Sequence, residues 1–537
     1  MSEAVDLVRA EYDAVPYESL AFPQSAPGQL AAIGHLFGLE VPDVPTARVL
    51  EIGCSSGGNL IPFAAGHPQA RAVGIDLSPV QIDQGRRNVR ALGLDNLELV
   101  HADIADMDLS GLGQFDFVIC HGVYSWVPDT VQDAILAAIE ALLVPTGIAY
   151  VSYNTYPGWK AKEIIRDAML MRGGGRGTPK EKLAFARGMI DFLASVAPSD
   201  SVLGQALTDY RETASHTRDY YQLHEYLEAF NAPCYFLDML ERAKEHRLTY
   251  LAEATPHTMF AYNYGESVAE PLMKECGHSQ VLLEQYLDFV VNRTFRQTML
   301  VHQERAPQIR YQLDRQRYHR MHFAAWLPAV DGDTVLDASP QGFGDRDAVV
   351  VTTADPAVKA ALDALTEAWP WTLSRPALAD AARKRLAAGG IDAAVDTLEG
   401  SVDTLLDLLI ARGMARFRLD PVVAPGVTAP RRLDETARRM AESSRWDANA
   451  FTFNQWHETL LLSPVDRHLV PLLDGTRDVD DLADALVALA RDNVIPLDTG
   501  NQADKQTMTD GALRDAAVSY VKELPQHLAA MKLCIAP

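Results

Sequence analysis

Short apolar runs recur along the first third of the chain, and helical patterns alternate with them. The runs have the length of buried strands and cover residues 49–52, 72–76, 97–103, 115–121 and 147–153. Apolar positions with helical spacing lie between them at 59–66, 79–92 and 130–143, and a short amphipathic helix at 29–37 precedes them. Alternation of this kind predicts an α/β fold in which helices cover both faces of a parallel sheet.

The pattern turns mainly helical after residue 154 and returns to strands only twice before residue 305. Helical periodicity over 160–245, clearest at 180–197 and 203–240, predicts an insertion between strands five and six. Residues 248–251 and 295–301 are the expected strands six and seven. Further on, a helix at 402–412 followed by a strand at 414–419, and a second stretch at 454–493, predict winged-helix-like modules in a mainly helical C-terminal region.

The first apolar run ends in a glycine-rich turn, within residues 48–60 that read RVLEIGCSSGGNL. A strand, a glycine turn and a helix in this order bring backbone N–H groups against a nucleotide-like ligand. We expect Gly53 to form the tight turn, and Gly57 and Gly58 to let the backbone approach the ligand. Asp76 ends the second run about 20 residues later, where a carboxylate can accept both hydroxyls of a ribose.

Two loops rich in aromatic residues follow strands four and five, at 121–128 and 154–159. Ligands bind at the carboxyl ends of strands in such sheets, so both loops are expected beside the reacting group. Exposed aromatic rings can cage an amine by cation–π attraction. Trp126 and Trp159 also fit as structural caps of the sheet, but two such loops at the same end of one sheet favour the amine cage.

These motifs resemble the class I S-adenosylmethionine methyltransferases, in which one acid follows the second strand and another follows the third. The stretches RVLEIGCSSGGNLIPFA, GIDLSPVQI, HGVYSWVP and SYNTYPGW look like the bacterial protein-lysine methyltransferases best known from rickettsiae, which modify lysines of outer-membrane proteins. Residues 224–254 and 292–302 resemble the methyltransferase regulatory domain of that family. The resemblance is strong from about residue 12 to 305 and weak beyond.

The resemblance implies S-adenosylmethionine as the cofactor. In that family pattern Asp76 would hold the ribose and Asp103 the adenine amino group, and Glu51 would place negative charge near the ammonium and sulfonium groups. The implied cofactor-binding residues are Glu51, Gly53, Cys54, Ser55, Gly57, Asn59, Asp76, Leu77, Asp103, Ile104 and His121.

The resemblance also implies a lysine amine of a polypeptide as the methyl acceptor. The candidate substrate contacts are Tyr17, Tyr124, Trp126, Asn154, Tyr156 and Trp159, and the candidate catalytic residues are His121, Tyr124 and Trp126. His121 or Tyr124 would orient the amine or accept its proton, while His121 fits a structural role as well. A small-molecule or natural-product methyltransferase on the same fold stays open, as does a non-catalytic binding protein, although the intact motif set disfavours the latter.

Domain boundaries follow from the same patterns. We expect an N-terminal helical lid at 1–45 and a cofactor-binding domain at 46–165 and 246–304. A helical insertion at 166–245 is expected to regulate the enzyme and to form a homodimer. A winged-helix-like middle domain at 305–430 and a helical C-terminal domain at 431–537 should follow.

Composition and charge limit which binding partners and which cellular compartment are expected. The net charge of −24 disfavours nucleic acid or an anionic membrane, both of which need basic surfaces, and it suits either a basic polypeptide or simple solubility. No apolar run is long enough to span a bilayer, and the N-terminus lacks a secretory signal. Five scattered cysteines without CxxC spacing predict neither disulfides nor a zinc site. A cytoplasmic protein is therefore expected.

Overall fold

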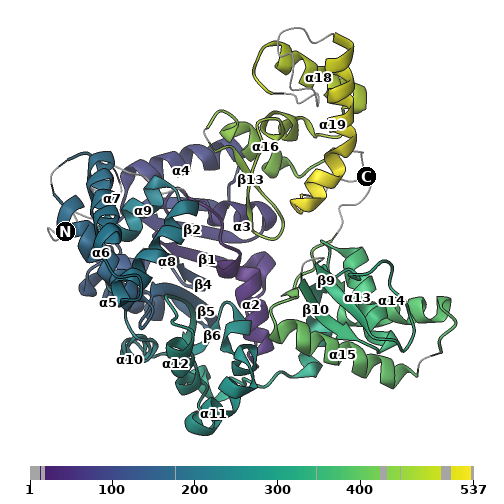
Figure 1. The fold of residues 1–537 in the computed structure, drawn as a ribbon, viewed down its shortest axis with the longest axis horizontal. Coiled ribbons are helices and arrows are strands. Elements are labelled where there is room, and N and C mark those ends of the chain that lie inside the picture. Colours follow the sequence, from purple (N-terminus) through teal and green to yellow (C-terminus); the bar gives the residue numbers. More distant parts are fainter. Residues whose placement is uncertain are drawn as a thin grey trace.

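A seven-stranded sheet lies at the centre of the N-terminal half, in the strand order β3-β2-β1-β4-β5-β7-β6 (Figure 1). The structure is a computed structural model that describes residues 13, 19–175, 177–345, 348–392, 394–423, 432–447, 449–496 and 510–533. The strands are β1 (Arg48–Ile52), β2 (Arg71–Asp76), β3 (Leu97–His101), β4 (Phe115–Cys120), β5 (Leu143–Asn154), β6 (Leu248–Glu253) and β7 (Phe295–His302).

The first five strands are parallel, and β7 runs antiparallel to both β5 and β6. This confirms the predicted parallel sheet and the two added strands. The fifth strand begins at Leu143, before the predicted residue 147, because its pairing with β4 is irregular: Leu143 pairs with Phe115, and Ile148 pairs with Phe117. The intervening Pro145 and Gly147 interrupt the apolar pattern from which the strand was predicted.

Helices cover both faces of the sheet, because successive strand residues point to opposite sides. Val49 belongs to the core on the side of α2, α3 and α4, while Leu50 belongs to the core on the side of α5 and α10. The helix α4 is defined at both ends, since the Ser78 hydroxyl caps its N-terminus and Gly93 ends it in the left-handed conformation. The bounds are α2 (Pro27–Leu36), α3 (Leu60–Gly66), α4 (Pro79–Leu92), α5 (Asp129–Leu142) and α10 (Phe236–Glu245).

The insertion forms a separate helical layer with its own small core. It consists of α6 (Trp159–Gly173), α7 (Pro179–Val196), α8 (Val202–His216) and α9 (Asp219–Leu227). The prediction of one helical stretch over 203–240 is wrong, because the chain leaves helical geometry at 228–235. That segment contains Pro233 and bonds instead to the loops of the sheet: Cys234 bridges to Thr155, and the Ala232 N–H donates to the Ser125 carbonyl.

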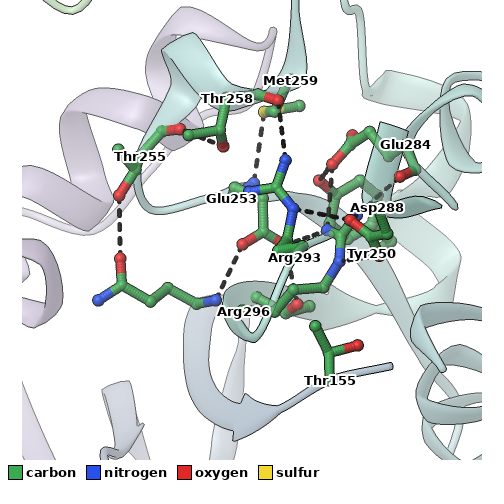
Figure 2. A network of polar contacts seen from close by, with 12 residues as sticks. Thr155, Tyr250, Glu253, Thr255, Thr258, Met259, Glu284, Asp288, Arg293 and Arg296 are labelled. Carbon is green, nitrogen blue, oxygen red and sulfur yellow. Dashed lines mark hydrogen bonds and ion pairs between the residues drawn. The ribbon is translucent and has the colours of Figure 1, made fainter. Parts of the chain in front are cut away.

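A buried ionic network joins β6 and β7 to the helix α12 (Gln280–Val290), which follows α11 (Glu266–Cys276) (Figure 2). The Arg296 guanidinium is fully buried and donates to Asp288 at 2.9 Å, to Glu253 at 2.7 Å and to Glu284 at 3.2 Å. Arg293 donates to Asp288 at 2.7 Å. Burial of charges is tolerated only where they are paired and hydrogen-bonded, so the network fixes the start of β7 rigidly.

Two further units follow the sheet domain along the chain, drawn in green and yellow in Figure 1. The middle unit contains β8 (His322–Ala324), β9 (Gln341–Asp345), β10 (Ala348–Thr353), α13 (Pro356–Ala368), β11 (Leu373–Ser374), α14 (Arg375–Ala388), α15 (Val395–Ala411) and β12 (Arg416–Arg418). The C-terminal unit contains α16 (Glu435–Ser444), the hairpin β13 (Phe451–Phe453) and β14 (Thr459–Leu461), α17 (Asp466–Leu469), α18 (Val479–Arg491) and α19 (Asp510–Ala530).

The predicted helix and wing strand of the middle unit are present as α15 and β12, and β12 pairs with β8. No helix within the described ranges is long and apolar enough to cross a membrane.

Candidate functional site

A cavity of about 540 Å³ opens at the carboxyl ends of the parallel strands. Its walls come from the turn after β1, from Asp76 at the end of β2, from the loops after β4 and β5, and from α6 and α9. A smaller cavity of about 70 Å³ shares Gly53, Asp76 and Leu77 with it and extends towards Asp103. The two cavities adjoin each other, because they share these lining residues.

The glycine turn after β1 is shaped by its neighbours. Gly53 has a φ of 76°, and a side chain there would place its Cβ 2.2 Å from Val123. Its N–H and that of Cys54 donate to the Ile75 carbonyl at 2.8 and 3.1 Å, which ties the turn to β2. Gly58 lies so close to the N-terminal segment that a Cβ would stand 2.1 Å from the Ser19 carbonyl oxygen.

Asp76 is held by the backbone on both of its carboxylate oxygens. The Ser55 N–H donates to one oxygen at 2.7 Å, and the Ser78 N–H donates to the other at 2.8 Å. Burial raises the pKa of this carboxyl, and the backbone bonds oppose the rise. Because each carboxylate oxygen has a further lone pair, Asp76 can still accept hydroxyl donors from a ligand in the cavity.

Glu51 lies buried in the wall of the larger cavity, and its two carboxyl oxygens differ in their hydrogen bonds. Its Oε1 accepts a hydrogen bond from Asn59 Nδ2 at 2.8 Å. Its Oε2 has no hydrogen-bond partner among the residues that the structure describes. Burial raises the pKa of the carboxyl to about 8, the Asn59 bond opposes this, and the nearby Asp76 charge adds to it. A buried carboxylate oxygen of this kind is suited to a cationic ligand group.

The smaller cavity is mainly apolar. Ile52, Ile104, Val127 and Ile135 line it, with Asp103 at its edge. The Asp103 carboxylate already accepts a hydrogen bond from the Ala105 N–H at 3.0 Å, which orients it. A small apolar cavity with one acid in its lining is suited to a heteroaromatic ring that carries an amino group.

His121 lines the larger cavity and is uncharged at neutral pH. Burial lowers its pKa to about 4. Its Nδ1 lies 2.8 Å from the Tyr150 hydroxyl, and its ring lies 3.8 Å from the ring of Phe22. A group with so low a pKa is a weak base, so His121 is poorly suited to accept a proton from the acceptor. Its neutral ring is better suited to form hydrogen bonds in the wall of the cavity.

The far end of the larger cavity is aromatic. Trp126, at the end of a 3₁₀ turn (Tyr124–Trp126), meets Trp159 edge to face at 6.1 Å, and Phe295 of β7 lies in the same lining. Asn154 joins them, with its amide fixed by Asn231 at 3.0 Å. At this end Lys162 forms an ion pair with Glu225 at 3.0 Å.

Comparison with known proteins matches three parts of the chain to families. Residues 49–147 match the "Methyltransferase domain", residues 218–302 the "Predicted methyltransferase regulatory domain", and residues 433–533 the "PKMT, C-terminal winged helix domain". Protein RP028 of Rickettsia prowazekii is 39% identical over 238 residues, which are 44% of this chain and 95% of that protein. RP789 of the same organism is 42% identical over 294 residues, 55% of this chain and 53% of that protein, so the chain spans about half the length of this relative.

The fold comparison extends over nearly the whole chain. The structure of PKMT2 from Rickettsia typhi in complex with AdoHcy superposes with a TM-score of 0.84 and 27% identity, covering 97% of this chain and 100% of that one. The chain belongs to the S-adenosylmethionine-dependent methyltransferases of the rickettsial protein-lysine methyltransferase family.

The residues of this methyltransferase fit S-adenosylmethionine. The unpartnered Glu51 Oε2 is suited to the ammonium of the cofactor, Asp76 to its ribose, and the smaller cavity lined by Asp103, Leu77 and Ile104 to its adenine. Cys54, Ser55, Asn59 and His121 also line the larger cavity. Bound there, the cofactor supplies a methyl group on a sulfonium, which is already activated for displacement.

Gly57 lines neither of the two cavities, and its cofactor contact stays a prediction. A Cβ on Gly57 would meet Leu99 at 3.3 Å, so the residue serves the packing of the turn on β3. Gly58 likewise admits the N-terminal segment rather than the ligand. The glycines after the turn are therefore explained by protein neighbours.

Two of the predicted acceptor residues are not among the residues that line the two cavities. Tyr124 is fully buried below the site, 6.2 Å from the ring of Tyr153, because its 3₁₀ turn points Tyr124 into the core. Burial raises its pKa further above the usual range, so a catalytic role for Tyr124 is not supported. Tyr156 lines neither cavity, and its hydroxyl donates to Glu163 at 2.5 Å. Tyr17 lies outside the described residues.

Sequence reasoning missed several residues of the site, namely Phe22, Gln81, Lys162, Glu225, Thr294 and Phe295. One signal pointed to the last two. An antiparallel strand begins where its parallel neighbour ends, so the start of β7 must lie at the ligand edge of the sheet. No comparable signal exists for Phe22, which reaches the cavity from the segment before α2.

Proposed function

We propose that this protein transfers a methyl group from S-adenosylmethionine to a lysine side-chain amine of a polypeptide. The proposal rests on the lining of the larger cavity. Glu51 and Asp76 line this cavity, and so does the aromatic wall formed by Trp126, Trp159 and Phe295. A long side chain entering from that end would place its amine against the cofactor methyl.

The aromatic wall supports an amine acceptor through two effects. A lysine amine in water has a pKa of about 10.4 and must lose a proton before it can attack. Removal of water by Trp126 and Trp159 disfavours the charged form, while ring faces still attract a partly charged amine in the transition state. The protein then needs mainly to align nucleophile, methyl and leaving sulfur.

Oriented acceptor groups complete the proposed amine site. The Asn154 side-chain amide is held by Asn231, and its backbone N–H donates to the Ser125 hydroxyl at 2.9 Å, so its position is fixed from two sides. The side-chain carbonyl of Asn154 is suited to accept a hydrogen bond from the lysine amine. Tyr124 is not part of this proposal.

Substrate polypeptides rich in basic residues suit the charge of the protein. The net charge of −24 favours a basic partner over nucleic acid, for which we propose no role. The described cysteines Cys54, Cys120, Cys234 and Cys276 are buried free thiols, which fits the proposed cytoplasmic location.

We further propose that the insertion forms a homodimer. Its helices expose large apolar side chains: Phe185 is 52% exposed, Phe192 56%, Val196 62% and Val202 69%. Light scattering should report a dimer for the parent and a monomer for Phe192→Asp, and a monomeric parent would contradict this assembly.

The proposed activity is tested by incubating the protein with methyl-labelled S-adenosylmethionine and a bacterial lysate. The label should appear in the protein fraction, and at a cofactor concentration near the parent Kd it should be about tenfold weaker with the Asp76→Ala variant. Label confined to small molecules would favour the alternative, a small-molecule methyltransferase on the same fold.

A further inference from the structure

The hairpin of the C-terminal unit reaches the cofactor-binding turn. The helix α16 of the same unit packs on α4 of the sheet domain, and the hairpin follows α16 in the chain. The tip of the hairpin is residues 454–458, and His457 sits there buried with a φ of 60°. Its Nε2 lies 2.9 Å from Oδ1 of Asn59, which is 398 positions away in the chain.

The direction of this hydrogen bond follows from the neighbours of Asn59. The Phe22 N–H can only donate, and it lies 2.9 Å from the same Oδ1, so that atom is the amide oxygen. The amide nitrogen therefore faces Glu51 Oε1 at 2.8 Å and Ser25 Oγ at 3.0 Å. Since Oδ1 can only accept, the His457 Nε2 carries a proton and donates it.

His457 is uncharged in this position. Burial lowers its pKa to about 3, the nearby Arg418 and His67 act in the same direction, and a hydrogen bond with the Asn59 backbone opposes them. A neutral Nε2–H donor is therefore present throughout the physiological range. It binds Asn59 without adding a cation beside the cofactor turn.

The hairpin tip is held firmly by the rest of the C-terminal half. The Trp456 indole N–H donates to the Pro370 carbonyl at 3.0 Å. Glu458 pairs with Arg416 at 2.6 Å and with Lys532 at 2.7 Å. Next to the tip, the Thr459 hydroxyl accepts a hydrogen bond from the Ala21 N–H at 2.8 Å. The left-handed backbone at His457 is thus supported from several sides.

We propose that His457 is a positioning residue for the cofactor site, acting through Asn59 on Glu51. The C-terminal unit would then be required for tight binding of the amino-acid end of the cofactor, through a side chain that itself touches no ligand. This rests on the assignment of the Glu51 cavity to S-adenosylmethionine.

The test compares two ligands that differ only at that end. S-adenosylhomocysteine carries the amino-acid group that Glu51 would bind, and 5′-methylthioadenosine lacks it. Calorimetry on the full chain should give a Kd for S-adenosylhomocysteine that is about threefold to tenfold higher for His457→Ala, which is the usual effect of one lost neutral hydrogen bond. The Kd for 5′-methylthioadenosine should be unchanged.

Three further variants control for folding. His457→Phe keeps the ring volume without the donor and should behave like His457→Ala, which keeps the test valid if the smaller side chain unfolds the hairpin. His457→Gln restores an N–H donor and should return the affinity to within about twofold of the parent. His468→Ala removes another buried histidine of the same unit and should leave both affinities unchanged.

The outcomes are distinguishable. If His457→Ala lowers the affinity for both ligands equally, or for neither, the positioning role of His457 is overturned while the cofactor assignment stands. A parent protein that binds neither ligand overturns the cofactor assignment and, with it, this inference.

Discussion

Asn59 donates its side-chain amide to one oxygen of Glu51 at 2.8 Å and leaves the other oxygen, Oε2, without a partner in the described part of the chain. A buried carboxyl in this state prefers to be protonated until a cation arrives. The Glu51 carboxyl is therefore mostly neutral in the ligand-free protein and becomes ionised when a cationic ligand group binds beside it.

The first prediction concerns pH and Glu51. Its pKa is about 8 in the folded protein and near the ordinary glutamate value of 4.5 when unfolded, so the folded state holds the extra proton between these values. The stability contributed is full below pH 4.5 and is lost as the pH rises towards 8. Thermal midpoints of the ligand-free protein, measured from about pH 5 to 8, should fall more steeply for the parent than for Glu51→Gln. Parallel curves would show that Glu51 titrates normally.

The second prediction concerns Asp76. Asp76→Ala removes charge-assisted hydrogen bonds to the ribose, worth about 1.5–3 kcal/mol each, and loosens Ser55 and Ser78. The affinity for S-adenosylhomocysteine should fall at least about tenfold. Because both ligands contain the ribose, the affinity for 5′-methylthioadenosine should fall by the same factor. The His457 variants, in contrast, should leave that affinity unchanged. Unchanged calorimetric affinity would remove Asp76 from the cofactor site.

The third prediction separates two aromatic residues of the acceptor loops. Trp126 lines the cavity, and Tyr156 does not. Trp126→Ala should lower the methylation rate about twofold to thirtyfold, which corresponds to roughly 0.5–2 kcal/mol of cation–π attraction, and should leave cofactor affinity nearly intact. Tyr156→Phe, which loses only the bond to Glu163, is the matched control and should keep the parent rate.

A Trp126→Ala protein that loses thermal stability and cofactor binding together would instead assign Trp126 a structural role. Retention of the full rate in that variant would exclude the amine-cage role.

The fourth prediction concerns the network of Figure 2. Arg296→Met leaves Glu253, Glu284 and Asp288 buried without their shared cation, which should cost about 3–5 kcal/mol of unfolding free energy. The control is Arg71→Met, since Arg71 and Glu98 are 58% and 60% exposed, and such surface pairs contribute about 1 kcal/mol or less. Denaturant unfolding of both variants measures the difference, and equal effects would contradict the role of the network.

Local patterns explain which parts of the site were predictable. Glu51 and Asp76 sit on strands whose apolar neighbours mark them, and strand ends in a parallel sheet meet at one edge. Tyr124 and Trp126 share one loop, but the direction of each ring depends on a single 3₁₀ turn that composition does not specify.

Long-range contacts explain what was missed. The bond between His457 and Asn59 spans 398 positions and depends on the packing of a separate unit against the sheet domain. The interruption of the helical stretch at 228–235 likewise depends on tertiary bonds to Ser125 and Thr155, which outweigh local helical periodicity.

Methyl transfer to the lysine amine can be measured on proteins whose lysines are either free or blocked. Lysate protein is divided, and the lysines of one half are blocked by acetylation before both halves receive the protein and methyl-labelled S-adenosylmethionine. We predict that the label enters the untreated half, that tandem mass spectrometry locates it on lysine Nε, and that the acetylated half stays unlabelled. Equal labelling of both halves, or label on another side chain, would contradict the account.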